Sequence, residues 1–290
     1  MSVPPNTLLP PKAPNLPIGP KEYNQRYQDQ LLNDLRRYFN TLDNTLGLLL
    51  GTGGGGGKYV RFPYGAFQDI AYTTLNGGIN NSVTTITVVS TTDFPTAGQL
   101  RIESEVVTYT GTTTTTFTGC TRGALGTTNA AHSTGVQVTK IQAHGANTAS
   151  AMYLNLVDAS NDVTVEGPDN TKSKITVVNA GIYNLQWSGQ FNNFDTALHD
   201  VSVWLRVNGV DITGSTGFVS IPNSHGGVDG HSIVGWNYFI ELAANDYVEI
   251  WWSSNSQQVT LECYGTQTSP TRPATASVIA TLSFVSALPA

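Results

Sequence analysis

Apolar and polar residues alternate along several segments of the C-terminal half of the chain. The alternating apolar positions are Tyr183, Leu185, Trp187, Gly189 and Phe191; Val201, Val203, Leu205 and Val207; Trp236, Tyr238 and Ile240; Val248, Ile250 and Trp252; and Val278, Ala280, Leu282 and Phe284. A period of two places these side chains on one face of a β-strand. Turn residues follow or precede the runs at Asn179-Ala180-Gly181, Asn208-Gly209 and Asn245-Asp246. The pattern predicts about eight or more antiparallel strands in two sheets over residues 142–290.

The composition supports a mainly β fold. Charged residues make up 12% of the chain, about half of the usual ~25%. A long solvated helical protein needs many more Glu and Lys residues on its outer faces, so the low charge excludes that class. Trp, Tyr and Phe number 5, 12 and 10, which excludes a chain kept disordered by charge. Chains rich in Thr and aromatic residues favour β-sheet.

The charge is acidic and gathers in the C-terminal half. The net charge is −6 over the whole chain, and no segment forms a basic patch, so we expect no nucleic-acid partner. No apolar run reaches the ~18 residues of a membrane span, and Met1–Pro20 lacks the apolar core of a secretory signal. We expect Cys120 and Cys263 to be free thiols, although a bridge between them stays open.

Residues 1–20 contain seven prolines, at positions 4, 5, 10, 11, 14, 17 and 20. Proline fixes φ and lacks an N–H donor, so this segment is predicted to be an extended arm. Its apolar residues Leu8, Leu9, Leu16 and Ile18 favour docking on a partner. A tail without contacts is the alternative.

Residues 21–50 have a helical pattern instead. A heptad seam contains Leu31, Leu35, Tyr38, Leu42 and Leu49, with Thr45 in register. Leu32, Phe39 and Leu46 form a flanking stripe. Because a single short helix with so wide an apolar stripe is not stable alone, we predict a coiled-coil stalk. The glycine-rich residues 51–58 after it are predicted to be a hinge.

Residues 76–141 are predicted to form a small β module with strands at Thr84–Val89, Gly98–Ile102, Val106–Thr110, Thr115–Thr118 and Val136–Ile141. Ile102–Val106 is predicted to be a hairpin. His132 has no second ligand at metal spacing, so we expect it to brace a loop. The segment FTGCTRG and its surroundings resemble a small β module that recurs in tail and fibre proteins of tailed bacteriophages.

A second resemblance concerns the C-terminal half. The runs ITVVNAGIYNLQWSGQF (175–191), VSVWLRVNGVDI (201–212), IPNSHGGVDG (221–230), WNYFIELAANDYVEIWWSS (236–254) and SPTRPATASVIATLSFVS (269–286) resemble the C1q/TNF-like domains of phage fibre proteins. The resemblance implies a ten-stranded jelly-roll β-sandwich that assembles as a homotrimer. Residues 62–69, FPYGAFQD, resemble the opening strand of that family. The resemblance therefore implies a jelly-roll knob made of residues 59–75 plus 142–290, with the module inserted at 76–141.

Exposed aromatic side chains can bind sugars because they pack on the apolar faces of pyranose rings. Candidate contacts to a host glycan are Trp204, Trp251 and Tyr264, with Arg206 and Asn193 as polar neighbours. The alternative places these aromatic residues in the core or a subunit interface. His225, Asp229 and His231 lie in a glycine-rich loop that forms either a turn or a cation site on the trimer axis.

Catalytic motifs of hydrolases and nucleotide-binding enzymes are absent from the sequence. Glu103 and Glu105 are paired carboxylates of the kind that hydrolyse glycosides, so a polysaccharide depolymerase is one alternative. We expect no enzyme, metal or cofactor.

Together these observations predict a structural virion protein, a trimeric tail fibre of a tailed phage that attaches to the host surface. It is expected to be assembled in the host cytoplasm and carried on the virion. Its expected partners are copies of itself, other virion proteins that bind residues 1–50, and a host glycan or protein. A head fibre or decoration protein mounted on the capsid is the other alternative.

Overall fold

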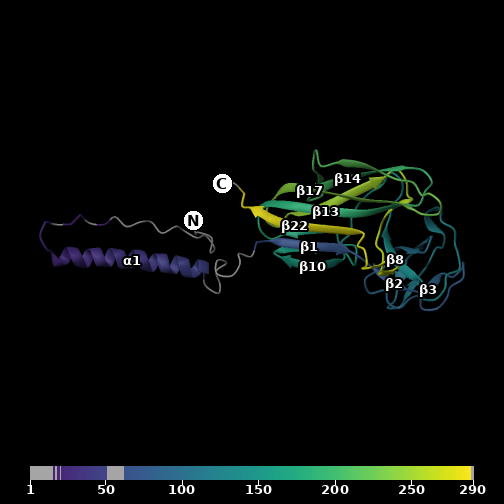
Figure 1. The fold of residues 1–290 in the computed structure, drawn as a ribbon, viewed down its shortest axis with the longest axis horizontal. Coiled ribbons are helices and arrows are strands. Elements are labelled where there is room, and N and C mark those ends of the chain that lie inside the picture. Colours follow the sequence, from purple (N-terminus) through teal and green to yellow (C-terminus); the bar gives the residue numbers. More distant parts are fainter. Residues whose placement is uncertain (1–15, 17, 20, 51–61, 289–290) are drawn as a thin grey trace. The chain divides into compact units, whose positions relative to one another are not determined.

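The computed structural model describes residues 16, 18–19, 21–50 and 62–288, and the side chains of all of them except 47–50. The chain divides into two compact units, Met1–Phe62 and Pro63–Ala290. In the described residues the first unit contains one helix, and the second is built mainly from strands (Figure 1). The prediction of a mainly β protein is confirmed.

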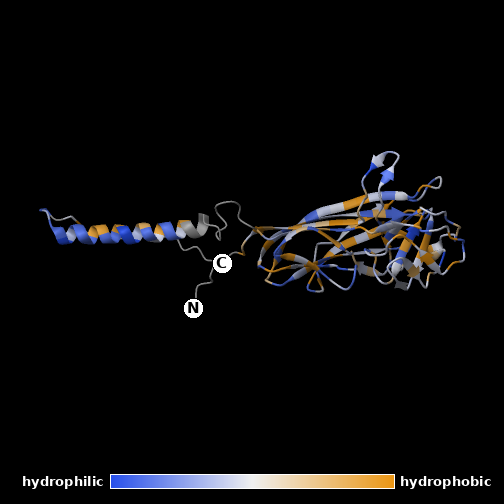
Figure 2. Ribbon diagram, turned by 90° about the horizontal axis from the view of Figure 1, so that it is seen from below, coloured by the Kyte–Doolittle hydropathy of each residue, from blue (hydrophilic) through white to orange (hydrophobic). Residues whose placement is uncertain are grey.

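Helix α1 spans Gln25–Leu50. It begins four residues after the predicted start because Asn24 caps it: the Tyr27 N–H donates to Asn24 Oδ1 at 3.1 Å. The seam residues Leu31, Leu35, Tyr38 and Leu42 are half-buried on the helix itself, and apolar residues recur along it (Figure 2). The side chain of Leu49 and the arm residues Leu8 and Leu9 lie outside the described residues, whereas Leu16 and Ile18 are exposed.

The first sheet of the larger unit is antiparallel. Its order is β10 (Leu156–Asn161), β1 (Tyr64–Asp69), β22 (Val278–Ser286) and β13 (Gly181–Asn193), with β17 (Gly230–Leu242) also paired to β13. Strand β1 thus lies between two strands from the C-terminal half of the chain.

The second sheet is antiparallel as well. It contains β11 (Val163–Glu166), β12 (Lys174–Val177), β18 (Tyr247–Ser254) and β14 (His199–Val207) in this order. Strands β15 (Val210–Asp211) and β16 (Gly217–Ile221) pair with β14, and β9 (Ala149–Ala151) pairs with β18.

The two sheets share one hydrophobic core, which makes them a β-sandwich. Tyr183 and Leu185 of the first sheet and Val203 and Trp252 of the second belong to this core and are fully buried. Each such side chain contributes about 1.5–3 kcal/mol through removal from water. The alternation of the sequence therefore corresponds to the inner faces of the two sheets, as predicted.

The inserted segment forms its own small fold. Its elements are β2 (Tyr72–Thr74), β3 (Thr85–Thr87), β4 (Gly98–Ile102), β5 (Glu105–Tyr109), β6 (Gly111–Thr112), β7 (Thr116–Thr118), the 3₁₀ turn Ala124–Gly126 and β8 (Gln137–Gln142). The predicted hairpin is confirmed, since Ile102 pairs with Glu105 across β4 and β5. A second hydrophobic core fills this module and begins at Ala71, five residues before the predicted boundary.

The module is joined to the sandwich through a continuous sheet. Strand β8 pairs with β19 (Val259–Glu262), which pairs with β13. A short hairpin, β20 (Gln267–Thr268) with β21 (Thr271–Arg272), follows β19. At the joint Lys140 and Gln142 donate to the buried carboxylate of Asp69, with the Gln142 contact at 2.8 Å. Figure 1 shows β8, β2 and β3 at the end of the larger unit opposite the free end of β22.

Both cysteines are buried and free. Burial raises the pKa of the Cys263 thiol to about 12, so this thiol is unreactive at neutral pH. No helix among the described residues is long and apolar enough to cross a membrane.

Candidate functional site

Three of the five predicted sugar contacts, Trp204, Trp251 and Arg206, meet on the outer face of the second sheet. Trp204 of β14 pairs with Trp251 of β18, and their ring centroids lie 6.4 Å apart at an interplanar angle of 35°. The Arg206 guanidinium lies 3.6 Å from the Trp251 ring centroid. We call Trp204, Trp251, Arg206 and Asp211 the aromatic patch.

Hydrogen bonds hold the aromatic patch in place. Trp204 Nε1 donates to Asp211 Oδ1 at 2.7 Å, and Arg206 Nε donates to the same oxygen. The hydrogen bond from Arg206 lowers the pKa of the Asp211 carboxyl. A stacked and ion-paired guanidinium keeps both indole rings in fixed orientations, so the patch presents a preformed, half-exposed aromatic surface.

The remaining two predicted sugar contacts lie elsewhere. Asn193 is fully buried, and its Nδ2 donates to the Ala197 carbonyl at 2.9 Å. The prediction for Asn193 is therefore wrong, because its amide braces a loop beneath the surface. Tyr264 is half-buried and follows β19, where its hydroxyl donates to Glu262 Oε2 at 3.0 Å.

Tyr264 lines a pocket of about 280 Å³ between the module and the sandwich, which we call the junction pocket. Arg101, Glu103, Val136, Gln137 and Thr139 form the module wall. Asp229, His231, Glu262 and Tyr264 form the sandwich wall. A concave site with a few convergent polar groups is the usual form of a small-ligand site.

Arg101 organises the charges of the junction pocket. Its Nη2 donates to Asp229 Oδ2 at 2.5 Å, and its Nη1 donates to Glu262 Oε1 at 3.1 Å. Burial opposes the charged guanidinium, but the attraction of Glu262 and Asp229 outweighs it and raises the pKa of Arg101. Burial and the neighbouring Glu262 raise the pKa of Tyr264. Tyr264 is thus a neutral donor and Arg101 a fixed cation.

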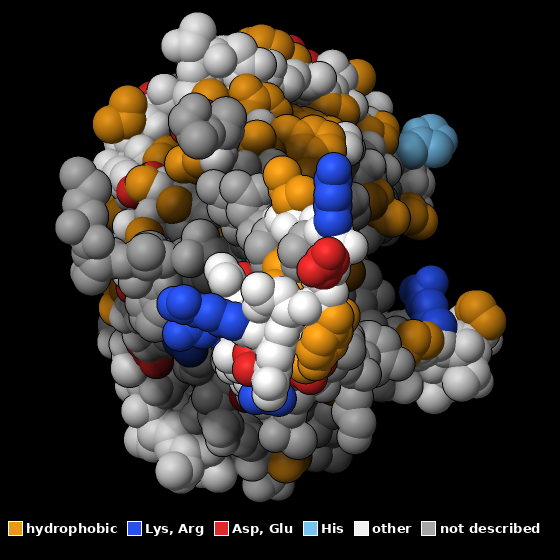
Figure 3. Space-filling view, turned by 90° about the vertical axis from the view of Figure 1, so that its left-hand side faces the viewer, with side chains coloured by type: hydrophobic (Ala, Val, Ile, Leu, Met, Phe, Trp, Pro, Cys, Tyr) orange, Lys and Arg blue, Asp and Glu red, His pale blue; other side chains and the backbone are white. Residues whose placement is uncertain are grey.

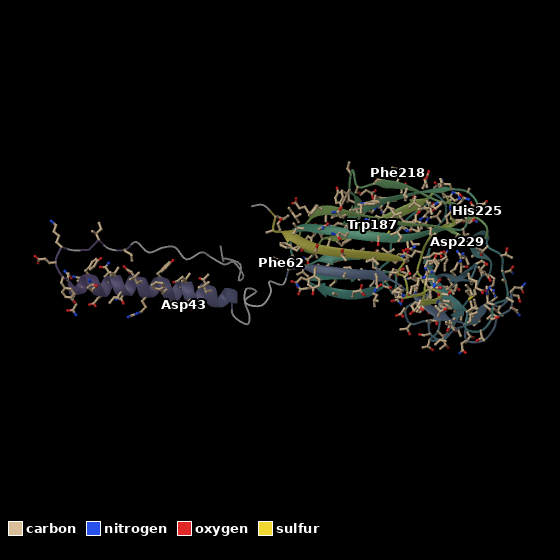
Figure 4. The ribbon with its side chains drawn as sticks, viewed as in Figure 1. Asp43, Phe62, Trp187, Phe218, His225 and Asp229 are labelled. Atoms are coloured by element: carbon tan, nitrogen blue, oxygen red, sulfur yellow. The ribbon has the colours of Figure 1, made fainter. Side chains whose placement is uncertain are left out.

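The predicted cluster of His225, Asp229 and His231 does not come together. His225 is exposed in a turn closed by its backbone hydrogen bonds with Val228, whereas Asp229 binds Arg101 and His231 faces Tyr264. Figure 4 shows His225 and Asp229 at the end of the sandwich that adjoins the module. Within the described residues no group of three His, Cys, Asp or Glu side chains is arranged to hold a metal.

Of the paired carboxylates of the module, Glu105 is engaged in hydrogen bonds within the module, whereas the Glu103 side chain is largely exposed. Glu105 is buried and accepts hydrogen bonds from Arg122, from the N–H groups of Gly123 and Ala130, and contacts His132 Nε2 at 2.8 Å. Burial alone would raise the pKa of Glu105, but the hydrogen bonds led by Arg122 lower it to about 2. A carboxylate held in this state cannot serve as a general acid near neutral pH. His132 also contacts Glu103 at 2.7 Å and so braces the loop, as predicted.

The outer face of the first sheet has an unusual composition. Strand pairing places Gln68, Ile279, Ser188 and Gly235 in one row, Ala66, Thr281, Gln186 and Asn237 in the next, and Tyr64, Ser283, Asn184 and Phe239 in a third. Glu241 follows on the same face of β17, and Asp158 of β10 accepts a hydrogen bond from Gln68 at 2.6 Å, but none of these twelve residues is charged. We call them the uncharged face. Phe239 is 59% exposed, and Ile279 is 47% exposed.

The outer face of the second sheet differs from the uncharged face because it contains charged residues. It includes the opposed charged pairs Arg206 with Glu249 and Lys174 with Glu166. Lys174 and Glu166 are exposed, as on a solvated sheet face, whereas Glu249 is buried. In the space-filling view, orange hydrophobic side chains lie along the uppermost rim of the larger unit (Figure 3).

No protein-family profile matches this chain, and no curated protein matches its sequence.

Sequence reasoning missed Arg101 and Glu262. They are 161 positions apart, and only the pairing of β8 with β4 and β19 brings them to 3.1 Å. The sequence does offer one signal: Glu262 lies two positions before Tyr264, at the end of an apolar strand.

Proposed function

We propose that the protein is a homotrimeric fibre of a tailed bacteriophage, with the sandwich folded as a C1q/TNF-like jelly roll that attaches to the host surface. The resemblance of the five C-terminal sequence runs to phage fibre domains supports this assignment. Two sheets around one core, with β1 inserted between C-terminal strands, agree with it.

The uncharged face is the observation that carries the proposal. A solvated sheet face normally includes Lys, Glu or Arg residues, and their depletion together with exposed aromatic residues is typical of subunit interfaces. Phe239 and Tyr64 lie at opposite ends of one row of this face. Contact with further copies of the chain removes these side chains from water.

Helix α1 supports the same conclusion independently. Leu32 is 55% exposed and Phe39 is 54% exposed on the helix. Within the described part of the chain no residue of the helix is buried. Three such helices can cover their apolar stripes in a parallel bundle, which would form the stalk.

In this proposal the aromatic patch contacts the host. It lies on the outer face of the second sheet, whereas the uncharged face belongs to the first, so the two surfaces do not compete. Weak sites repeated on three subunits and on several fibres raise the avidity of the particle without one strong site.

The attachment role is tested on virions. An antibody against the sandwich should label appendages of purified particles, and the purified protein should compete with particles for adsorption to host cells. Labelling of a tail appendage supports the tail fibre, and labelling over the capsid supports the head-fibre alternative. A particle without any label contradicts the proposal.

The depolymerase alternative has little support. Five hydrogen-bonding groups occupy the Glu105 carboxylate, so it is not available to a substrate. We expect no release of reducing sugar when the protein is incubated with host polysaccharide.

A further inference from the structure

We propose that the junction pocket binds one neutral sugar ring of the host surface glycan. The inference rests on the attachment role proposed above and adds to it a second site, with a chemical class of ligand.

The floor of the pocket is a rigid polar platform. Glu262 is 1% exposed and accepts hydrogen bonds from Asn192 at 3.0 Å, from Thr260 at 2.8 Å and from Tyr264 at 3.0 Å, in addition to Arg101. Side chains fixed in this way lose little conformational entropy when a ligand binds. The platform is therefore preorganised.

The rim offers groups that are still available. His231 is exposed, and its ring lies 6.2 Å from the Tyr264 ring at an angle of 79°. Among the described residues neither His231 nitrogen has a hydrogen-bond partner, and Asp229 accepts only through Oδ2. A ligand thus meets an imidazole and a free carboxylate oxygen beside an aromatic ring.

This combination suits a sugar. Hydroxyl groups both donate and accept, so they match the imidazole nitrogens and Asp229 Oδ1 at once. The apolar C–H face of a pyranose ring can pack on Tyr264, which is an apolar ring with its hydroxyl already engaged. The volume of about 280 Å³ accommodates a single ring.

The charges that line the junction pocket favour neutral sugars over anionic ones. Glu103, Asp229 and Glu262 carry three negative charges around the pocket against the one positive charge of Arg101. Anionic sugars are therefore disfavoured. Arg101 already occupies the position between Asp229 and Glu262, and its positive charge disfavours a metal ion there.

The pocket also gives the inserted module a role. Arg101 and Glu103 come from the module, whereas Asp229 and His231 come from the sandwich. Neither part forms the pocket without the other, so the insertion creates a site that the sandwich alone lacks.

The test measures binding of the full-length protein to glucose, galactose, mannose, N-acetylglucosamine and rhamnose by ligand-observed NMR, with sialic acid as the anionic probe. We expect at least one neutral sugar to bind in the millimolar range. His231→Ala should weaken this binding at least fivefold. His225→Ala is the matched control, since His225 is equally exposed in the adjoining loop but does not line the pocket, and it should bind as the parent protein does.

Three results would overturn the inference. They are the absence of binding by all five neutral sugars, binding of sialic acid alone, and neutral-sugar binding that survives His231→Ala but is lost in Trp251→Ala. The last result would assign the sugar to the aromatic patch. The oligomeric state and virion labelling are measured separately, so failure here is distinguishable from failure of the fibre proposal.

Discussion

At the scale of single residues, buried charges hold the module together. Arg122 Nε and Nη2 each lie 2.7 Å from an oxygen of Glu105, whose side chain is completely buried. Removing one partner of such a pair leaves an uncompensated charge in a medium of low polarity, which costs several kcal/mol. The same reasoning applies to Lys140 and Asp69 at the joint between the module and the sandwich.

Acid should destabilise the protein through Glu105 of the module. The pKa of Glu105 lies at about 2 in the folded protein, against an ordinary value of 4.5. Because the folded pKa is the lower one, the stabilisation is complete above pH 4.5 and is lost as the pH falls from 4.5 towards 2. The shift corresponds to about 3 kcal/mol, which thermal unfolding followed between neutral and acidic pH can measure.

The variant Glu105→Gln tests whether the Glu105 carboxyl is the group that makes the protein sensitive to acid. The variant should be less stable than the parent at pH 7 by on the order of 3 kcal/mol and should lose less stability on acidification. Glu166→Gln is the control, because Glu166 is exposed on β11 of the second sheet. Equal acid sensitivity of parent and Glu105→Gln would contradict the assignment.

A separate prediction concerns the aromatic patch. Trp251→Ala removes one of the two neighbouring indole rings and the ring on which Arg206 stacks. Adsorption of the protein to host cells should fall at least tenfold, which corresponds to about 1.4 kcal/mol. Phe218→Ala is a control with an aromatic residue that is 80% exposed on β16. The patch is not the contact if both variants adsorb equally.

At the scale of elements, local patterns predicted more than long-range pairings. The alternation along residues 183–191 and 201–207 identified inner faces because each strand position has only two possible orientations. The hairpin at Ile102–Val106 was predictable because its two strands are adjacent in sequence. Nothing local indicates that Gln142 of β8 pairs with Leu261 of β19, 119 positions later, so the junction pocket was not predictable.

The buried Asn193 illustrates a related limit. Its sequence neighbours suggest a polar surface loop, yet Nδ2 donates to the carbonyls of Ala197 and Ile221. A polar residue at the end of a strand is buried when it can satisfy backbone groups of a loop that folds back over it. Sequence alone does not distinguish this role from exposure.

Helix α1 is predicted to pack against copies of itself through its apolar seam. Leu35→Asn with Leu42→Asn places polar groups in the seam, and amide hydrogen exchange over residues 25–50 of the full chain should become faster at least tenfold. Arg36→Gln with Asp43→Asn changes exposed positions off the seam and should leave the exchange unchanged. Fast exchange in the parent protein itself would contradict a helical bundle.

At the scale of the whole molecule, two units of different structure share one property. The helix has exposed Leu32 and Phe39, and the sandwich has exposed Tyr64, Phe239 and Ile279 on an uncharged face. Large apolar side chains that gather on one face usually mark an interaction surface. Self-association would remove the exposed apolar side chains of both units from water, so oligomerisation is the central claim of this account.

A charge on the uncharged face should separate the subunits. Thr281 pairs with Ala66 on one side and Gln186 on the other. Thr281→Lys should raise the concentration at which the subunits dissociate by on the order of a hundredfold, because an unpaired ammonium must leave water. Thr164→Lys on the exposed outer face of the second sheet is the control and should have no effect.

The molar mass of the full-length protein in solution, measured by light scattering at micromolar concentration, tests the central claim most directly. The account predicts three times the 31.0 kDa of one chain. A stable species with the mass of a single chain at that concentration would contradict it.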